Sequence, residues 1–194
     1  MANFETVEVN SDILILGGGM GACGVALEAA YWGKKHNLKV ALVDKAAMDR
    51  SGAVAMGLSA INQYVGVKDG QNTIKNYVDY VRNDLMGVTR EDLVANIARH
   101  VDSTVHLFEK WGLPIWKDAE GNYVHEGRWQ VMINGESYKC IVAEAAKTAL
   151  QDIGGEIYER VFIVEPLVEG DRCVGAVGFS TRENKYYVFR AKAV

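Results

Sequence analysis

The stretch SDILILGGGMGA, residues 11–22, joins a short apolar run to a cluster of glycines. The run SDILIL is rich in β-forming residues and predicts a buried parallel strand. The alanine-rich segment that follows ends in basic residues, as the carboxyl end of a helix prefers, and predicts a helix over residues 22–35. The run KVALV, residues 39–43, predicts a second buried strand that stops at Asp44. Residues 11–44 are therefore expected to form a β-α-β unit.

The glycine cluster fits a dinucleotide-binding fingerprint in two registers. Gly17, Gly19 and Ala22 fit GxGxxA. A second register, at Gly19, Gly21 and Gly24, fits GxGxxG. We prefer the first, because its loop begins where the predicted strand ends. In that register Gly17 allows a tight turn, Gly19 lets the backbone approach a pyrophosphate at the helix N-terminus, and Ala22 lets helix and strand pack closely.

Asp44 stands at the end of the second strand, where such units carry an acid for the ribose of the nucleotide. A carboxylate accepts hydrogen bonds from a vicinal diol and repels a 2′-phosphate. The interval from Gly17 is longer than the usual ~20 residues, and residues 32–38 can hold the excess. A solvated acid at a strand end, with no ligand, is the alternative reading.

The stretch DRSGAVAMGLSAIN, residues 49–62, is a run of small residues soon after the second strand. Small residues let the backbone lie along an extended cofactor, whereas a nicotinamide-binding fold more often continues into its next helix. This run therefore favours FAD over NAD.

The middle of the chain predicts a helical insertion over about residues 71–112. Its second half has apolar residues at helical spacing and stops at Gly112, which predicts one helix with a single buried face. The residues of this expected face are Leu93, Ile97, Val101, Val105 and Phe108.

Residues 156–194 contain three β-type runs joined by turn residues, over residues 157–165, 173–179 and 186–194. This pattern predicts an antiparallel meander. Together with the β-α-β unit, it gives the fold class: an α/β, Rossmann-like domain with a parallel sheet, a β-meander and inserted helices. The chain stops inside the last apolar run, so we expect a truncated, partial domain over residues 1–194.

Composition narrows the function. Apolar residues make up 49% of the chain, charged residues 24%, and the net charge is −4, which gives no basic footprint for nucleic acid. No apolar run reaches the roughly 20 residues of a membrane span, and the start lacks the layout of a signal peptide. The three cysteines are scattered and form no CxxC pair, so we expect a cytoplasmic protein with no metal site.

Beyond these local signals, long runs of the chain resemble a known family. The order GxGxxA, VDK and SGAVAxGLSAIN resembles the fumarate reductase/succinate dehydrogenase flavoprotein superfamily. Within it, the chain resembles adenylylsulfate reductase alpha subunits through four longer runs: RSGAVAMGLSAIN, YVRNDLMG, RHVDSTVHLFEKWGLP and GRWQVMINGESYKCIVAEAAK. Complete subunits of that family are about three times longer, which agrees with the expected truncation.

The resemblance implies a two-electron reaction at FAD that interconverts adenylylsulfate and AMP plus sulfite. It implies an iron–sulfur beta subunit as the partner that delivers electrons. Relatives with covalent flavin carry a histidine where this chain has Ser51-Gly52-Ala53, so FAD is expected to be bound without a covalent link. Asn62 would lie near flavin N5, with a turn-capping role as the alternative, and Arg128 would bind sulfate or phosphate, with a structural ion pair as the alternative.

The site expected from the sequence combines these assignments. Asn62 and Arg128 are the catalytic candidates, and near Phe162 the main chain is expected to contact adenine. The residues expected to bind the cofactor are Gly17, Gly19, Met20, Gly21, Ala22, Asp44, Lys45, Ser51, Gly52, Ser59, Asn62 and Phe162. Two other functions stay open: a different oxidoreductase of the superfamily, such as a fumarate reductase or aspartate oxidase, and a fragment that binds cofactor without catalysis.

Overall fold

The structure is a computed structural model that describes residues 4–61, 66 and 72–194. The chain divides into two compact units. The first, here called the sheet unit, comprises residues 1–56 and 138–194. The second, the middle unit, comprises residues 57–137.

The sheet unit alternates strands and helices along the chain. Its elements are β1 (Glu5–Leu16), α1 (Met20–His36), β2 (Val40–Asp44), the 3₁₀ turns η1 (Met48–Arg50) and η2 (Ala53–Met56), α5 (Tyr138–Gln151), β6 (Glu156–Glu159), β7 (Val161–Glu169), β8 (Arg172–Ser180) and β9 (Lys185–Ala193).

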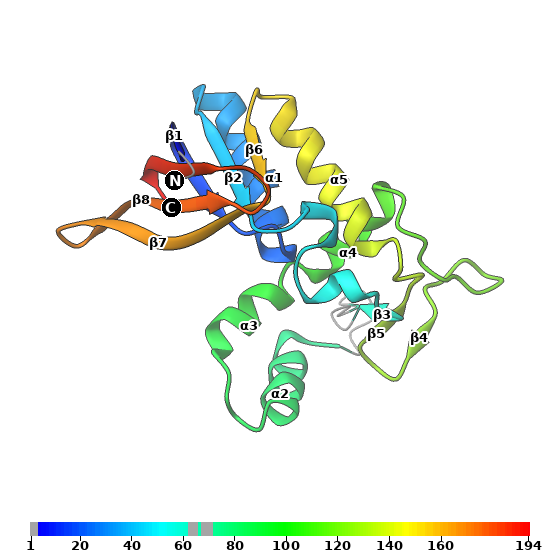
Figure 1. Cartoon of the computed structure of the whole chain (residues 1–194). Coiled ribbons are helices and arrows are strands. Elements are labelled where there is room, and N and C mark those ends of the chain that lie inside the picture. The colour runs from blue at the N-terminus through cyan, green and yellow to red at the C-terminus, as the bar shows by residue number, and fades with distance from the viewer. Residues whose placement is uncertain (1–3, 62–65, 67–71) are drawn as a thin grey trace. The chain divides into compact units, whose positions relative to one another are not determined.

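These strands form a single sheet in the order β6-β2-β1-β9-β8-β7 (Figure 1). β1 is parallel to β2 through its last third and parallel to β9 through most of its length. β6 extends the parallel part beyond β2, while β8 runs antiparallel to β7 and β9. The expected α/β class, with parallel strands continued by a meander, is confirmed. The core beneath this sheet is Val9, Leu14, Ala41, Val43, Val161, Ala176, Tyr187 and Phe189.

Helices α1 and α5 pack against each other beside the parallel strands. The buried face of α1 consists of small residues, which lets neighbouring elements approach closely: a side chain at Gly33 would lie 2.9 Å from Ile153 Cδ1. The buried residues of α1 are Cys23, Ala26, Ala29, Ala30 and Gly33. The alanine-rich composition therefore serves packing as well as helix propensity.

The prediction of a single strand over residues 157–165, at the start of the meander, is wrong. Residues 157–165 form two strands instead of one, because the chain turns at Arg160, whose φ is +62°. The Arg160 N–H donates to the Ala46 carbonyl over 3.1 Å, and its carbonyl accepts the N–H of Thr181 over 2.7 Å. β6 thus completes the parallel part, and β7 alone begins the meander.

The middle unit holds short helices and a small sheet in the order β3-β5-β4. Its elements are β3 (Ala60–Ile61), α2 (Ile74–Asp84), α3 (Glu91–Ala98), α4 (Val101–Lys110), β4 (His125–Glu126) and β5 (Gln130–Met132). An aromatic pair is central to its core: the rings of Tyr77 and Trp129 meet edge to face at 5.5 Å, against Val94, Ala98 and Val101.

The single helix expected around residues 93–108 is wrong. It is broken into α3 and α4 at His100, whose N–H donates to the Ile97 carbonyl over 2.9 Å, three residues back instead of four. The break changes the phase of the buried face, so Leu93 and Ile97 are 54% and 45% exposed, while Val94 and Ala98 are buried. The expected face holds only after the break, from Val101 onward. Within the ranges that the structure describes, no helix has the length and apolarity needed to cross a membrane.

Candidate functional site

The glycine loop joins β1 to α1 in the sheet unit. β1 ends at Leu16, and Gly17 then takes a φ of +106°, which an L side chain rarely adopts. Its N–H donates to the Val43 carbonyl over 2.7 Å, so the loop starts against the end of β2. Gly19 is the N-cap, and α1 begins at Met20, in agreement with the first of the two glycine registers.

The first turn of α1 is suited to an anion. Met20, Gly21 and Ala22 form this turn together with Cys23, and none of these described residues is acidic. The first amides of a helix have no partner within the helix, and the helix dipole adds partial positive charge there. A pyrophosphate is the group that such a turn accepts.

Asp44 lies at the carboxyl end of β2 with only 4% of its surface exposed. Its Oδ2 accepts the Ser51 hydroxyl over 2.6 Å, and Ser51 is itself buried. A side chain at Gly18 would lie 2.7 Å from the Asp44 carboxyl group, so only glycine leaves room for it. Sequence reasoning missed Gly18, although the run of three glycines at residues 17–19 was a signal for it.

Gly52 brings the small-residue run against the glycine loop. Its φ is +84°, and a Cβ there would lie 2.9 Å from the Cα of Gly19. The two backbones are therefore in direct contact. This contact places the beginning of the expected flavin-side run next to the turn expected to bind pyrophosphate.

A pocket of about 300 Å³ opens at the carboxyl ends of β1 and β2 and beside the start of β7. In parallel α/β sheets, this edge is where ligands bind. The Phe162 ring is 41% exposed, and Lys45 Nζ lies 6.0 Å from its centre. The pocket is lined by Leu16, Gly17, Val43, Asp44, Lys45, Val161, Phe162 and Ile163.

These features fit an adenine dinucleotide. Asp44 offers a fixed acceptor for a ribose diol, Phe162 an apolar ring surface near the expected adenine, and Gly17 an open backbone beside the first turn of α1. The predicted residues Gly17, Gly19, Met20, Gly21, Ala22, Asp44, Lys45, Ser51, Gly52 and Phe162 all lie in the sheet unit.

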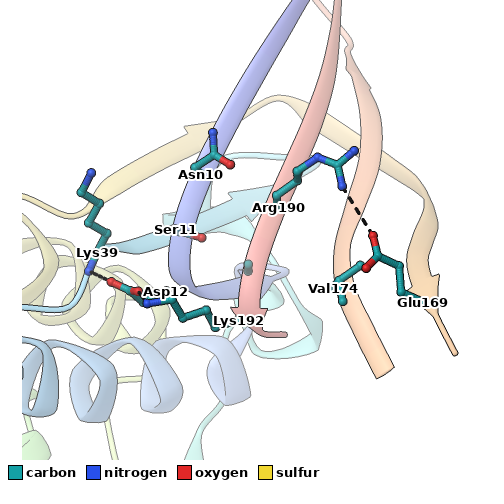
Figure 2. Close-up of a pocket in the computed structure, with 9 residues that line it drawn as sticks. Asn10, Ser11, Asp12, Lys39, Glu169, Val174, Arg190 and Lys192 are labelled. Atoms are coloured by element: carbon teal, nitrogen blue, oxygen red, sulfur yellow. Dashed lines mark hydrogen bonds and ion pairs between the residues drawn. The ribbon is translucent and has the colours of Figure 1, made fainter. Parts of the chain in front are cut away.

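A larger hollow of about 510 Å³ lies elsewhere in the sheet unit, beside Lys39 at the amino end of β2 (Figure 2). Four of its charged side chains are already paired: Lys192 contacts Asp12 at 2.6 Å, and Arg190 faces Glu169 at 3.8 Å. The hydrogen bond from Lys192, and then that from the Lys39 backbone, lower the pKa of Asp12. Because it lies away from the carboxyl edge and two of its cationic side chains, Arg190 and Lys192, are already paired with carboxylates, this larger hollow suits an anionic dinucleotide less well than the smaller pocket.

The other predicted residues belong to the middle unit. The Ser59 carbonyl accepts the Ile133 N–H over 3.0 Å, beside a hollow of about 490 Å³ that is also lined by Trp116. Arg128 Nε donates to Asn72 Oδ1 over 2.6 Å, and its guanidinium lies 5.0 Å from the Trp129 ring centre. Asn62 lies outside the described residues.

Gly135 shapes the same hollow of the middle unit. A Cβ there would lie 1.3 Å from the Leu58 carbonyl oxygen, so the two backbones touch. No other residue type fits at Gly135 without moving Leu58. The sequence reading did not single out this glycine, because nothing local distinguishes it from a turn glycine.

The comparisons with known proteins agree with this geometry. Residues 12–194 match the family model of the FAD binding domain. Subunit alpha of adenylylsulfate reductase from Megalodesulfovibrio gigas is 50% identical over an alignment of 214 positions, which covers 97% of this chain and 31% of that protein.

Two solved structures are similar throughout. Adenylylsulfate reductase from the hyperthermophilic Archaeoglobus fulgidus matches with a TM-score of 0.89 and 60% identity, over 97% of this chain and 30% of that one. An adenosine-5-phosphosulfate reductase in complex with sulfite, as a covalent adduct, matches with a TM-score of 0.90 and 59% identity, over 98% of this chain and 31% of that one. The chain thus spans about a third of the length of these relatives. Since the family model covers nearly all of its residues, the chain belongs to the FAD binding domain family.

Proposed function

We propose that this chain forms the FAD-binding part of the flavin-bearing subunit of an adenylylsulfate reductase, which interconverts adenylylsulfate and AMP plus sulfite. The observation that carries the proposal is identity of 50–60% to adenylylsulfate reductases over almost the whole chain. The alternatives within the superfamily, a fumarate reductase or an aspartate oxidase, have no such support.

We assign the adenosine half of FAD to the pocket at the carboxyl ends of β1 and β2. Asp44, fixed by Ser51, accepts the ribose hydroxyls. Lys45 and the main chain at Phe162 border the adenine. The pocket's position at this edge and the burial of Asp44 support the assignment.

The pyrophosphate is assigned to the glycine loop and the first turn of α1. Gly17 and Gly19 leave the backbone open, and the amides of Met20, Gly21 and Ala22 donate to the phosphate oxygens. The absence of acidic residues from this described turn supports the assignment.

The flavin half is assigned to the small-residue run that begins at Ser51 and Gly52. From there the chain leads to Ser59 and Asn62, the residue that we propose beside the reacting edge of the flavin. When bound, FAD supplies the two-electron chemistry. The role of the chain is to hold and orient it, and Arg128 is proposed to bind the sulfate or phosphate group of the substrate.

FAD is proposed to be bound without a covalent link. No histidine occurs between Asp44 and Ile61, so the flavin-side run has no imidazole for attachment. Acid precipitation tests this: FAD should appear in the supernatant, whereas flavin that stays with the pellet contradicts the proposal.

An iron–sulfur beta subunit is proposed as the electron-delivering partner. The relative from Megalodesulfovibrio gigas is named as subunit alpha, which supports a multi-subunit assembly. The three cysteines of this chain are all free thiols, which fits the proposed cytoplasmic, reducing compartment.

The proposal is tested with the full polypeptide that contains this chain, co-purified with its partner. Adenylylsulfate should reoxidise a reduced dye and release equal amounts of AMP and sulfite. Fumarate serves as the matched control substrate and should be inactive. Reduction of fumarate without reaction of adenylylsulfate would assign the chain to another branch of the superfamily.

A further inference from the structure

Lys139 is a buried lysine of the sheet unit that the site described above does not use. It lies in the first turn of α5 and is 1% exposed. It belongs to the buried stripe of that helix, in step with Val142, Ala146 and Leu150. A lysine is rarely buried so fully, because removing an ammonium group from water costs several kcal/mol unless it is paired.

The contacts of Lys139 leave its charge without a partner of opposite sign. Its Nζ donates to the Met48 carbonyl and lies 3.3 Å from Cys23 Sγ. Among the residues that the structure describes, no carboxylate forms an ion pair with it. Lys147, two turns further along the same helix, is different: it is paired with Glu159 at 3.1 Å and is partly exposed.

Both contacts belong to segments that adjoin the site assigned to pyrophosphate. Cys23 is in the first turn of α1, and its thiol is directed at the carbonyl of Gly18 over 3.8 Å. Met48 begins η1, the turn that leads to Ser51 and Gly52. Lys139 therefore connects the two segments that meet at the Gly19–Gly52 backbone contact.

We propose that Lys139 is the buried counter-charge and positioning residue of the FAD pyrophosphate. This inference rests on the proposed pyrophosphate site at the glycine loop. The negative charge that is missing from the protein around Lys139 arrives with the cofactor. A positive charge in a low-dielectric interior attracts a nearby dianion more strongly than a solvated lysine does. Lys139 thus favours the FAD-bound state over the free protein.

Two variants of Lys139 separate its charge from its hydrogen bond. Lys139→Met keeps a linear side chain but removes both the charge and the donor to Met48. Lys139→Gln removes the charge and keeps an amide donor. The control is Lys34→Met, which removes a lysine from the exposed last turn of α1 with the same change in net charge.

The experiment measures the Kd for FAD and the Tm with and without FAD, in the full polypeptide stripped of cofactor. Both Lys139 variants should bind FAD at least tenfold more weakly, about 1.4 kcal/mol. The rise in Tm on adding FAD should shrink in both, while Lys34→Met stays within twofold of the unchanged protein. A purely structural lysine would instead lower both Tm values together and leave the rise intact.

Every other outcome counts against the inference. Wild-type affinity in Lys139→Gln would assign Lys139 to hydrogen bonding alone, and unchanged affinity in both variants would remove it from the FAD site. If Lys139→Met fails to fold, the Lys139→Gln measurement decides. Failure of the unchanged protein to bind FAD would refute the proposed function instead, so the two failures are distinguishable.

Discussion

Any side chain at the position of Gly18 would overlap the carboxylate of Asp44. The middle glycine of residues 17–19 therefore serves the acid at the end of β2, while its neighbours serve the phosphate. This explains why the loop has glycine at three successive positions, although the fingerprint requires only alternate ones. The Ser51 hydroxyl also donates to Asp44 Oδ2 and so fixes the carboxylate.

We predict that Gly18→Ala weakens FAD binding about tenfold or more, because the displaced Asp44 loses ribose hydrogen bonds worth about 1–3 kcal/mol. Gly24→Ala is the matched control: its Cβ meets nothing within 4 Å, and alanine favours the helix by about 1 kcal/mol. Fluorescence titration with FAD measures both. Equal FAD affinity in the two variants would show that a side chain at position 18 does not displace Asp44.

Among the elements, those with local signals were predictable. The β-α-β unit was found because an apolar run, a glycine turn and a strand-end acid all lie within one short segment. Lys139 lies at helical spacing from the apolar residues Val142 and Ala146, which indicates a position on the buried face. Because lysine is usually exposed, it is not expected from the sequence to be part of that face. Neither the helix break at His100 nor the strand break at Arg160 is marked by a glycine or a proline, so neither has a clear local signal.

The break at Arg160 gives a prediction about β6 and β7. A non-glycine residue with φ near +60° is strained by about 1–2 kcal/mol, and glycine relieves that strain at some cost in chain entropy. Arg160→Gly should therefore raise the Tm slightly, by an amount equal to about 0.5–1 kcal/mol. Arg182→Gly, in the loop between β8 and β9, is the control and should not raise it. A lower Tm for Arg160→Gly would mean that the arginine side chain is needed at this turn.

Gly135 gives a prediction for the middle unit. Gly135→Ala forces the chain away from Leu58 and should destabilise this unit by about 3 kcal/mol, at the upper end of overpacking effects. Asn134→Ala changes only the adjacent exposed side chain and should cost less than about 0.5 kcal/mol. Urea unfolding followed by tryptophan fluorescence reports mainly on this unit, which holds Trp111, Trp116 and Trp129. Equal urea midpoints for Gly135→Ala and Asn134→Ala would contradict the close backbone contact between Gly135 and Leu58.

Across the whole molecule, carboxyl groups with a lowered pKa are more numerous in the middle unit than in the sheet unit, among the residues that the structure describes. In the sheet unit, Asp12 has a lowered pKa. In the middle unit, the pKa of Glu109 is lowered by hydrogen bonds from Lys117 and then Tyr123, and that of Asp118 by the Asn122 backbone and side chain. In the same unit, hydrogen bonds from basic neighbours also lower the pKa values of Asp79, Glu91 and Asp92.

Acid should therefore destabilise the middle unit more than the sheet unit. A carboxyl group with a lowered pKa binds fewer protons in the folded than in the unfolded state. Its contribution to the free energy of unfolding is therefore complete above the unfolded pKa, which is 3.8 for aspartate and 4.5 for glutamate, and is lost as the pH falls through the folded pKa. Partial desolvation of the otherwise exposed His125 lowers its pKa below 6.5, so this histidine opposes folding as the pH falls through that value. We expect the urea midpoint of tryptophan fluorescence to fall in two stages, the first as the pH falls below 6.5 and the second below about pH 4.5. His125→Gln should abolish the first stage, and 1 M salt should weaken the second because these carboxylates are exposed. A midpoint that stays constant between pH 7 and pH 3 would contradict both assignments.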